Sequence, residues 1–126
     1  MGGRHAVRRR PSNGPKVRID GDATSAPSPF DLLLAAIASC ASTDLLTIFR
    51  KQRTPTRSLK VTVEATRVSA TPQRLASAVL HFEIRGTGIT LEKAKRAVEL
   101  SVTKYCSVRS SLIADAPVTW TIDLKT

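Results

Sequence analysis

Residues 28–40 read Ser-Pro-Phe-Asp-Leu-Leu-Leu-Ala-Ala-Ile-Ala-Ser-Cys, which combines a helix start signal with a long apolar run. Ser28 suits the N-cap position, where its hydroxyl accepts a hydrogen bond from the amide of Asp31. Pro29 falls at the first helical position, where its missing N–H is harmless, and Asp31 places negative charge at the positive end of the helix dipole. These signals predict a helix that runs from Ser28 to about Phe49.

The first half of this helix has no polar face. From Leu32 to Ala41 nearly every side chain is apolar or small, a pattern typical of a helix that is buried on all sides. A chain of 126 residues offers few places to enclose such a helix. We therefore expect a sheet on one side of it and a partner subunit on the other, in a homodimer.

The sequence around this first helix also contains strand patterns. Apolar and polar residues alternate at 59–66 and at 78–85, which predicts two half-buried strands joined as an antiparallel hairpin. A third strand is expected from Val118 to Leu124. A short run from Lys16 to Ile19, close to the Asn13-Gly14 turn signal, indicates a further strand.

A second long helix is expected between the hairpin and the last strand. Thr90 is a candidate N-cap for a helix from Leu91 to about Cys106, and a short helical turn should follow from Val108 to Ala114. The elements together give an α+β fold, in which helices and strands do not alternate regularly.

Positive charge is concentrated at the N-terminus. The net charge is +10, and more than half of it comes from the basic residues that precede Asp20: Arg4, Arg8, Arg9, Arg10, Lys16 and Arg18. This distribution predicts a basic N-terminal arm over residues 1–25, part disordered or a short hairpin, and a folded domain over residues 26–126. Aromatic residues make up 4% of the chain, too few for a stacking platform, so a nucleic-acid partner is not favoured.

Targeting signals are weak. No apolar segment follows the basic N-terminus within 25 residues, and the longest apolar stretch, Leu32 to Ala38, is far short of the roughly 20 residues that span a bilayer. The sequence predicts a soluble cytoplasmic protein without a membrane partner. Two cysteines in that compartment are expected to be reduced or redox-active.

Cys40 and Cys106 leave three interpretations open. They are small hydrophobes of the core, a structural disulfide, or a redox pair. No CxxC or HxxxH pattern joins them to His5 or His81, so neither a metal site nor a cofactor is predicted.

A redox role requires a thiolate at Cys40. Because Cys40 lies in mid-helix, the dipole of its own helix is not available, and an arginine from another segment is expected to supply the charge. Asp31 could orient that arginine as well as cap the helix. Asp44 lies one turn after Cys40, and we interpret it as structural because an acid there would raise the pKa of the thiol.

Two motifs resemble the OsmC/Ohr family. Residues 28–40 are similar to its "SPxELLLAALAxC" helix, and Lys104-Tyr105-Cys106-Ser107-Val108 resembles its "KYCxV" helix end. The spacing of strand, strand and helix between the two motifs is also similar, across residues 26–124.

This resemblance implies an intertwined homodimer in which antiparallel sheets wrap two long helices. It implies that Cys40 attacks a small hydroperoxide and becomes a sulfenic acid, and that Cys106 resolves it as an intramolecular disulfide, which an external dithiol reduces. It also implies an N-terminal arginine beside the thiolate and an acid that holds this arginine.

The matching acid in this chain is Asp31, with Phe30 at the position that the hydroperoxide-resistance branch gives to its acid. The arginine is Arg4, within Gly2-Gly3-Arg4, or Arg18. The OsmC-like branch is therefore the closer match.

The sequence thus predicts a thiol-dependent peroxidase that reduces organic hydroperoxides or H₂O₂. Two other functions are kept open: a non-catalytic dimer that binds a small ligand, and a nucleic-acid-associated basic protein that uses the arm.

Overall fold

The structure is a computed structural model, and it describes residues 17–112 and 115–125. Its helices are α1 (Pro29–Lys51), α2 (Leu91–Leu100), the π-helix η2 (Ser101–Tyr105) and the single turn α3 (Ser107–Ser110). Its strands are β1 (Ser58–Arg67), β2 (Leu75–Arg85) and β3 (Val118–Lys125). The predicted α+β class is confirmed.

The three strands form one sheet in the order β1-β2-β3. The β1–β2 hairpin is antiparallel, as predicted, but β3 pairs parallel to β2. The expectation of a wholly antiparallel sheet is therefore wrong for these strands. The reason is the connection, since α2, η2 and α3 carry the chain back across the sheet before β3 begins, and such a crossover produces a parallel neighbour.

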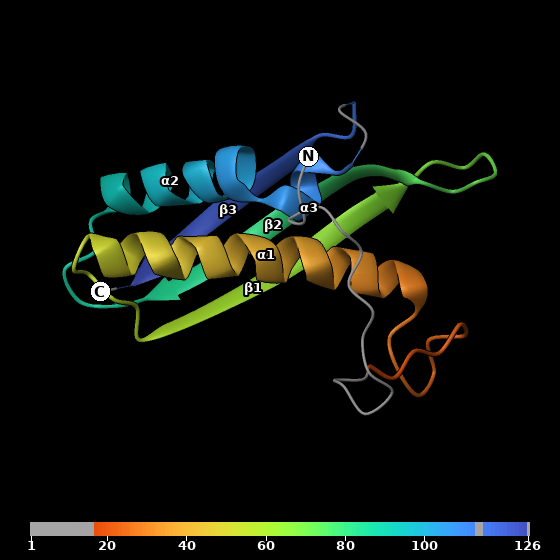
Figure 1. Cartoon of the computed structure of the whole chain (residues 1–126), viewed down its shortest axis with the longest axis horizontal. Coiled ribbons are helices and arrows are strands. Elements are labelled where there is room, and N and C mark those ends of the chain that lie inside the picture. Colours follow the sequence, from red (N-terminus) through yellow and green to blue (C-terminus); the bar gives the residue numbers. More distant parts are fainter. Residues whose placement is uncertain (1–16, 113–114, 126) are drawn as a thin grey trace, which may run out of the picture.

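Helices α1 and α2 lie side by side on one face of the sheet, so the molecule has two layers (Figure 1). The core between the layers takes alternate residues of β2, and Ala78, Leu80, Phe82 and Ile84 are all buried, as the alternation predicted. The turn between β1 and β2 projects beyond the helix layer, near the start of α1 (Figure 1). The opposite face of the sheet is polar, with His81 of β2 hydrogen-bonded to Thr121 of β3.

The start of α1 follows the sequence signals closely. The amide of Asp31 donates to the hydroxyl of Ser28 at 3.1 Å, and the amide of Ser28 donates back to the carboxylate of Asp31 at 3.1 Å. This reciprocal capping box satisfies two amides that the helix itself cannot bond. The helix ends at Lys51, two residues beyond the predicted Phe49.

Only one face of α1 is buried within the single chain. Ile37, Ala41, Leu45 and Phe49 are fully enclosed by the sheet and α2. On the outer face, Ala35 is exposed and most other apolar positions of the helix are half-buried. Burial of this face by a partner subunit stays a prediction.

In the part of the chain that the structure describes, α1 is also the one helix long and apolar enough to cross a membrane. The apolar run at 32–38 was judged too short to span a bilayer, but α1 as a whole is long enough. Its threonines and serines do not interrupt its overall apolar character. A helix that forms the core of a globular protein meets the same criteria, and α1 contributes four fully buried side chains to this core.

The strand expected near the N-terminus needs correction. Val17 to Ile19 are not a strand; they lead into a turn in which the carboxylate of Asp20 accepts hydrogen bonds from Asp22, Thr24 and Ser25. The predicted hairpin at Asn13-Gly14 lies outside the described residues.

The second long helix is not continuous to Cys106. It changes to a π-helix at Ser101, whose buried hydroxyl donates to the carbonyl of Ala97 at 2.8 Å. The following turn, α3, spans Ser107–Ser110, shorter than the predicted turn. The wider turns of the π-helix rotate Cys106 relative to the face that a continuous α-helix would give it.

The capping box should contribute measurably to stability. Ser28→Ala is expected to lower the free energy of unfolding by about 1 kcal/mol, because it leaves an amide unbonded. Asp31→Ala should act on the same unit, so the double variant should lose less than the sum of the two single losses. Ser39→Ala, in the exposed middle of α1, is the matched control and should change stability by about 0.5 kcal/mol or less. Denaturant unfolding at one fixed protein concentration measures all four; strict additivity of the two losses would contradict the reciprocal cap.

Candidate active site

The two cysteines come from different elements and are both free thiols. Cys40 lies in the middle of α1, one residue before the buried Ala41. It is therefore about 100° around the helix from the centre of the core face, and its side chain is half-buried. Cys106 follows the π-helix and is 3% exposed.

The turn after the π-helix brings the second cysteine to the first. Cys106 is extended and acts as the N-cap of α3, with its sulfur accepting the amide of Arg109 at 3.3 Å. This geometry points the start of α3 at α1, so that the hydroxyl of Ser107 lies 3.9 Å from the sulfur of Cys40. The thiols are close enough for each to influence the ionisation of the other.

The surroundings of Cys40 favour its thiolate. Burial is the largest single influence and by itself would raise the pKa of Cys40. It is outweighed by hydrogen bonds from the backbone N–H of Val108, the thiol of Cys106, and the hydroxyl and backbone N–H of Ser107, so the pKa lies below the ordinary value for a cysteine. A lowered pKa increases the fraction of the nucleophilic form near neutral pH.

The surroundings of Cys106 act in the opposite direction. Burial raises the pKa of Cys106, the amide of Arg109 offsets part of the rise, and the neighbouring Cys40 adds to it. A second negative charge beside the first thiolate is unfavourable. The surroundings therefore favour the thiolate at Cys40 and the thiol at Cys106.

Among the described residues, the groups that lower the pKa of Cys40 are donors at and beside the start of α3. An arginine beside the thiolate stays a prediction. Arg18 is exposed before the Asp20 turn, and within the described residues no hydrogen bond links it to Cys40. Arg4 lies outside the described residues.

The side chain of Asp31 caps the start of α1. Its carboxylate accepts the amide of Ser28, and among the described residues it forms no ion pair with an arginine. Asp44, interpreted from the sequence as structural, is half-buried one turn beyond Cys40, and its Oδ2 atom is enclosed without a hydrogen-bond partner in the described part of the chain.

Ser107 and the amide of Val108 are the functional groups that the sequence argument missed. The available signal was local: a hydroxyl residue follows Cys106 directly, inside the "KYCxV"-like motif. Recognising its role required the contact between α3 and α1, which joins residues 67 positions apart.

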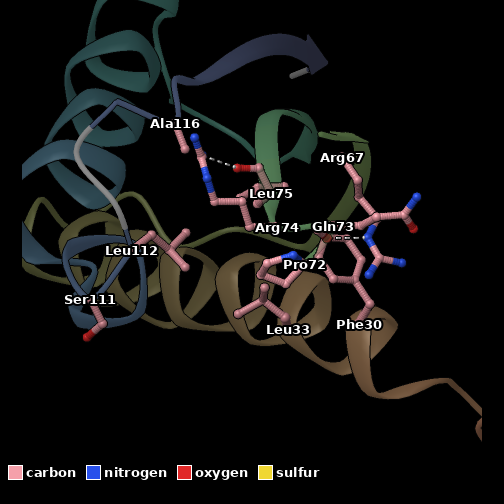
Figure 2. A pocket seen from close by; sticks show the side chains of 10 residues that line it. All are labelled: Phe30, Leu33, Arg67, Pro72, Gln73, Arg74, Leu75, Ser111, Leu112 and Ala116. Carbon is pink, nitrogen blue, oxygen red and sulfur yellow. Dashed lines mark hydrogen bonds between the residues drawn. The ribbon is translucent and has the colours of Figure 1, made fainter. Parts of the chain in front are cut away.

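A cavity of ≈ 400 Å³ lies at the start of α1, and neither cysteine is among the residues that line it (Figure 2). Leu33, one of its lining residues, precedes Cys40 by seven residues, about 10 Å along the helix axis. Ser111 and Leu112, which follow α3, form another part of the wall. Across residues 17–112 and 115–125, no group of three or more His, Cys, Asp or Glu side chains is arranged to hold a metal ion.

These features define a class of protein: a two-layer α+β domain with a thiol on the central helix and a second thiol presented by a turn. The chain belongs to the OsmC-like protein family, whose sequence model matches residues 20–121.

Similar proteins include a bacterial relative in sequence and two solved structures. YhfA of Escherichia coli K12 is 32% identical over 98 residues, which is 77% of this chain and 73% of YhfA. An OsmC-like protein from Mycoplasma pneumoniae has a TM-score of 0.74 at 18% identity, covering 86% of this chain and 81% of its own. The organic hydroperoxide resistance protein OsmC from Legionella pneumophila has a TM-score of 0.64 at 18% identity, covering 80% and 72%. At these identities the two structures establish a shared fold.

The donors at the start of α3 should change the pH dependence of Cys40 alkylation. Alkylation by iodoacetamide is expected to modify Cys40 before Cys106 near neutral pH, because its thiolate forms at lower pH and it is the less buried of the two. Ser107→Ala should move the pH profile of Cys40 alkylation to higher pH, since one thiolate donor is lost. Ser110→Ala, on the exposed end of the same turn, is the matched control and should leave the profile in place. Peptide mass analysis of the labelled chain makes the measurement; identical profiles for the Ser107 variant and wild type would exclude this role.

Proposed function

We propose that the chain is a cysteine-based hydroperoxide reductase. The observation that carries the proposal is the meeting of the two cysteines: Cys106 caps the turn α3, whose Ser107 hydroxyl lies 3.9 Å from the sulfur of Cys40. The surroundings lower the pKa of Cys40 and raise the pKa of Cys106. A peroxidatic pair needs two different sulfurs. One attacks the hydroperoxide as a thiolate, and the other stays a thiol until it resolves the sulfenic acid. Family membership and the hydroperoxide-resistance proteins among its structural neighbours support it.

The proposed chemistry has three steps. The Cys40 thiolate attacks the distal oxygen of ROOH, the O–O bond breaks, and Cys40 becomes a sulfenic acid. The alkoxide RO⁻ leaves and takes up a proton from solvent to give ROH. The sulfur of Cys106 then attacks the sulfur of Cys40, forming a disulfide and releasing water. An external dithiol reduces the disulfide and is itself oxidised to a disulfide, which restores both thiols.

The protein contributes position and electrostatics. The amides of Ser107 and Val108 and the hydroxyl of Ser107 stabilise negative charge on the Cys40 sulfur before attack. Cys106 is held near Cys40 by its place as N-cap of α3. An arginine, Arg4 or Arg18, in the same or a second subunit, would add to this stabilisation under the proposal.

The homodimer is part of the same proposal. Its support is the outer face of α1, where Leu46 is 36% exposed and several apolar side chains are only half-buried. The hydroxyls of Ser42, Thr43 and Thr47 donate to carbonyls of the same helix, so burial of this face would leave none of these donors unsatisfied.

Hydroperoxide should act on both thiols in a defined order. One equivalent of cumene hydroperoxide is expected to consume both thiols of the wild type and to join Cys40 to Cys106. Cys106→Ser should react once and stop at a trappable sulfenic acid, which more peroxide over-oxidises. Cys40→Ser should retain its one thiol. Thiol titration, dimedone labelling and peptide mapping distinguish these products.

Survival of both thiols in excess peroxide would exclude the reductase. It would leave ligand binding without catalysis, for which the cavity at the start of α1 is the supporting observation.

Association through α1 should be measurable in solution. Sedimentation equilibrium is expected to give twice the 13.6 kDa of one chain. Leu46→Glu should weaken the dimer at least about tenfold, because it places a charge in the proposed apolar interface. Leu91→Glu makes the same change at an exposed leucine of α2 and is the control. A monomeric wild type at micromolar concentration would rule out this assembly.

A further inference from the structure

The cavity at the start of α1 is built from segments far apart in the sequence. Its walls come from the first turns of α1, the end of β1, the β1–β2 turn with the start of β2, and the chain after α3 (Figure 2). Its volume of ≈ 400 Å³ falls within the usual range for small-molecule sites, roughly 300–1,000 Å³. Most of the lining is apolar: Phe30, Leu33, Pro72, Leu75, Leu112 and Ala116.

Two arginines interrupt this apolar lining, and one of them is held in place without a carboxylate. The guanidinium of Arg67 lies over the ring of Phe30, 4.0 Å from its centroid. Its Nε donates to the carbonyl of Gln73 at 2.8 Å. The three ion pairs formed within the described residues belong to other side chains. Stacking and a single backbone bond thus fix the group and leave both terminal nitrogens free of any acid in this part of the chain.

The second arginine is already engaged. Arg74 donates to the carbonyl of Leu75 at 3.3 Å, and its other terminal nitrogen lies 3.7 Å from the carboxylate of Asp115. Asp115 therefore offsets the charge of Arg74 at one side of the cavity. The site has an excess of about one positive charge, which suits a monoanion better than a dianion such as a phosphate monoester.

We propose that this cavity binds a small monocarboxylate with an apolar body. The planar guanidinium of Arg67 presents parallel N–H donors that match a carboxylate in a bidentate arrangement. Leu33, Leu75 and Leu112 provide the apolar surface for the hydrocarbon part. Phe30 and Gln73 orient the guanidinium before the ligand arrives, which reduces the entropy lost on binding.

The proposed site is separate from the thiol pair. Neither Cys40 nor Cys106 lines the cavity. Binding of a carboxylate requires no redox step, so this inference does not depend on the reductase activity. Either one can fail while the other holds.

The test compares octanoate with octan-1-ol, which have the same chain length and differ in charge. Isothermal titration of the wild-type chain is expected to show octanoate binding about tenfold more tightly than octan-1-ol, since a hydrogen-bonded carboxylate at Arg67 adds to the shared apolar contact. Arg67→Gln should remove this difference and keep the affinity for octan-1-ol, which also reports that the cavity is intact.

The matched control is Arg96→Gln, at an exposed position of α2. It removes the same charge from a strongly basic chain, and it should keep the preference for octanoate. Equal affinity of the wild type for the two ligands, or absence of binding of both at millimolar concentration, would overturn the proposal. So would an equal loss in the two arginine variants, because the preference would then reflect net charge alone.

Discussion

Packing of α1 against the sheet is the contact on which the rest of the molecule depends. Ile37, Ala41, Leu45 and Phe49 are spaced by four residues and form a continuous stripe that is fully buried. Each large side chain of this kind contributes roughly 1.5–3 kcal/mol when it leaves water. Because the stripe fixes the rotation of the helix, it also fixes the direction of every other side chain on α1.

The position of Cys40 follows from that rotation. Cys40 falls at the border of the stripe, where a thiol is partly desolvated and still within reach of donors from another element. Desolvation alone would raise the pKa of Cys40, and the donors of α3 reverse the effect. The site therefore depends on a balance between the core, which buries the sulfur, and the turn after Cys106, which stabilises its charge.

The π-helix links the core to that turn. Ala94, Ala97 and Val98 of α2 are packed in the core, and Ser101 and Val102 of η2 continue this buried face. The wider turns of η2 then redirect the chain. Cys106 follows η2 in an extended conformation and is the N-cap of α3. A π-helical turn next to a functional group is a recurring arrangement, since it changes the direction of side chains without interrupting the helix.

Short stretches of neighbouring residues specify most of the elements and their local signals. The capping residues Ser28 and Asp31, the apolar character of α1 and the alternation in β2 are encoded over a few neighbouring positions, and all three are present in the structure. The two cysteine motifs identified the family for the same reason, because each is a short contiguous pattern. Two local predictions failed, the strand at Val17 to Ile19 and the unbroken helix to Cys106. The other features that were predicted poorly lie at points where distant segments meet.

Packing between distant segments determines which groups surround Cys40 and where the cavity lies. The contact between Ser107 and Cys40 joins α3 to α1, and the cavity with Arg67 joins the end of β1 to the start of α1. The parallel pairing of β3 likewise depends on how the chain crosses the sheet. Hydrogen bonding and burial act through space at a few ångströms, so their partners are set by packing, and no local pattern in the sequence specifies them.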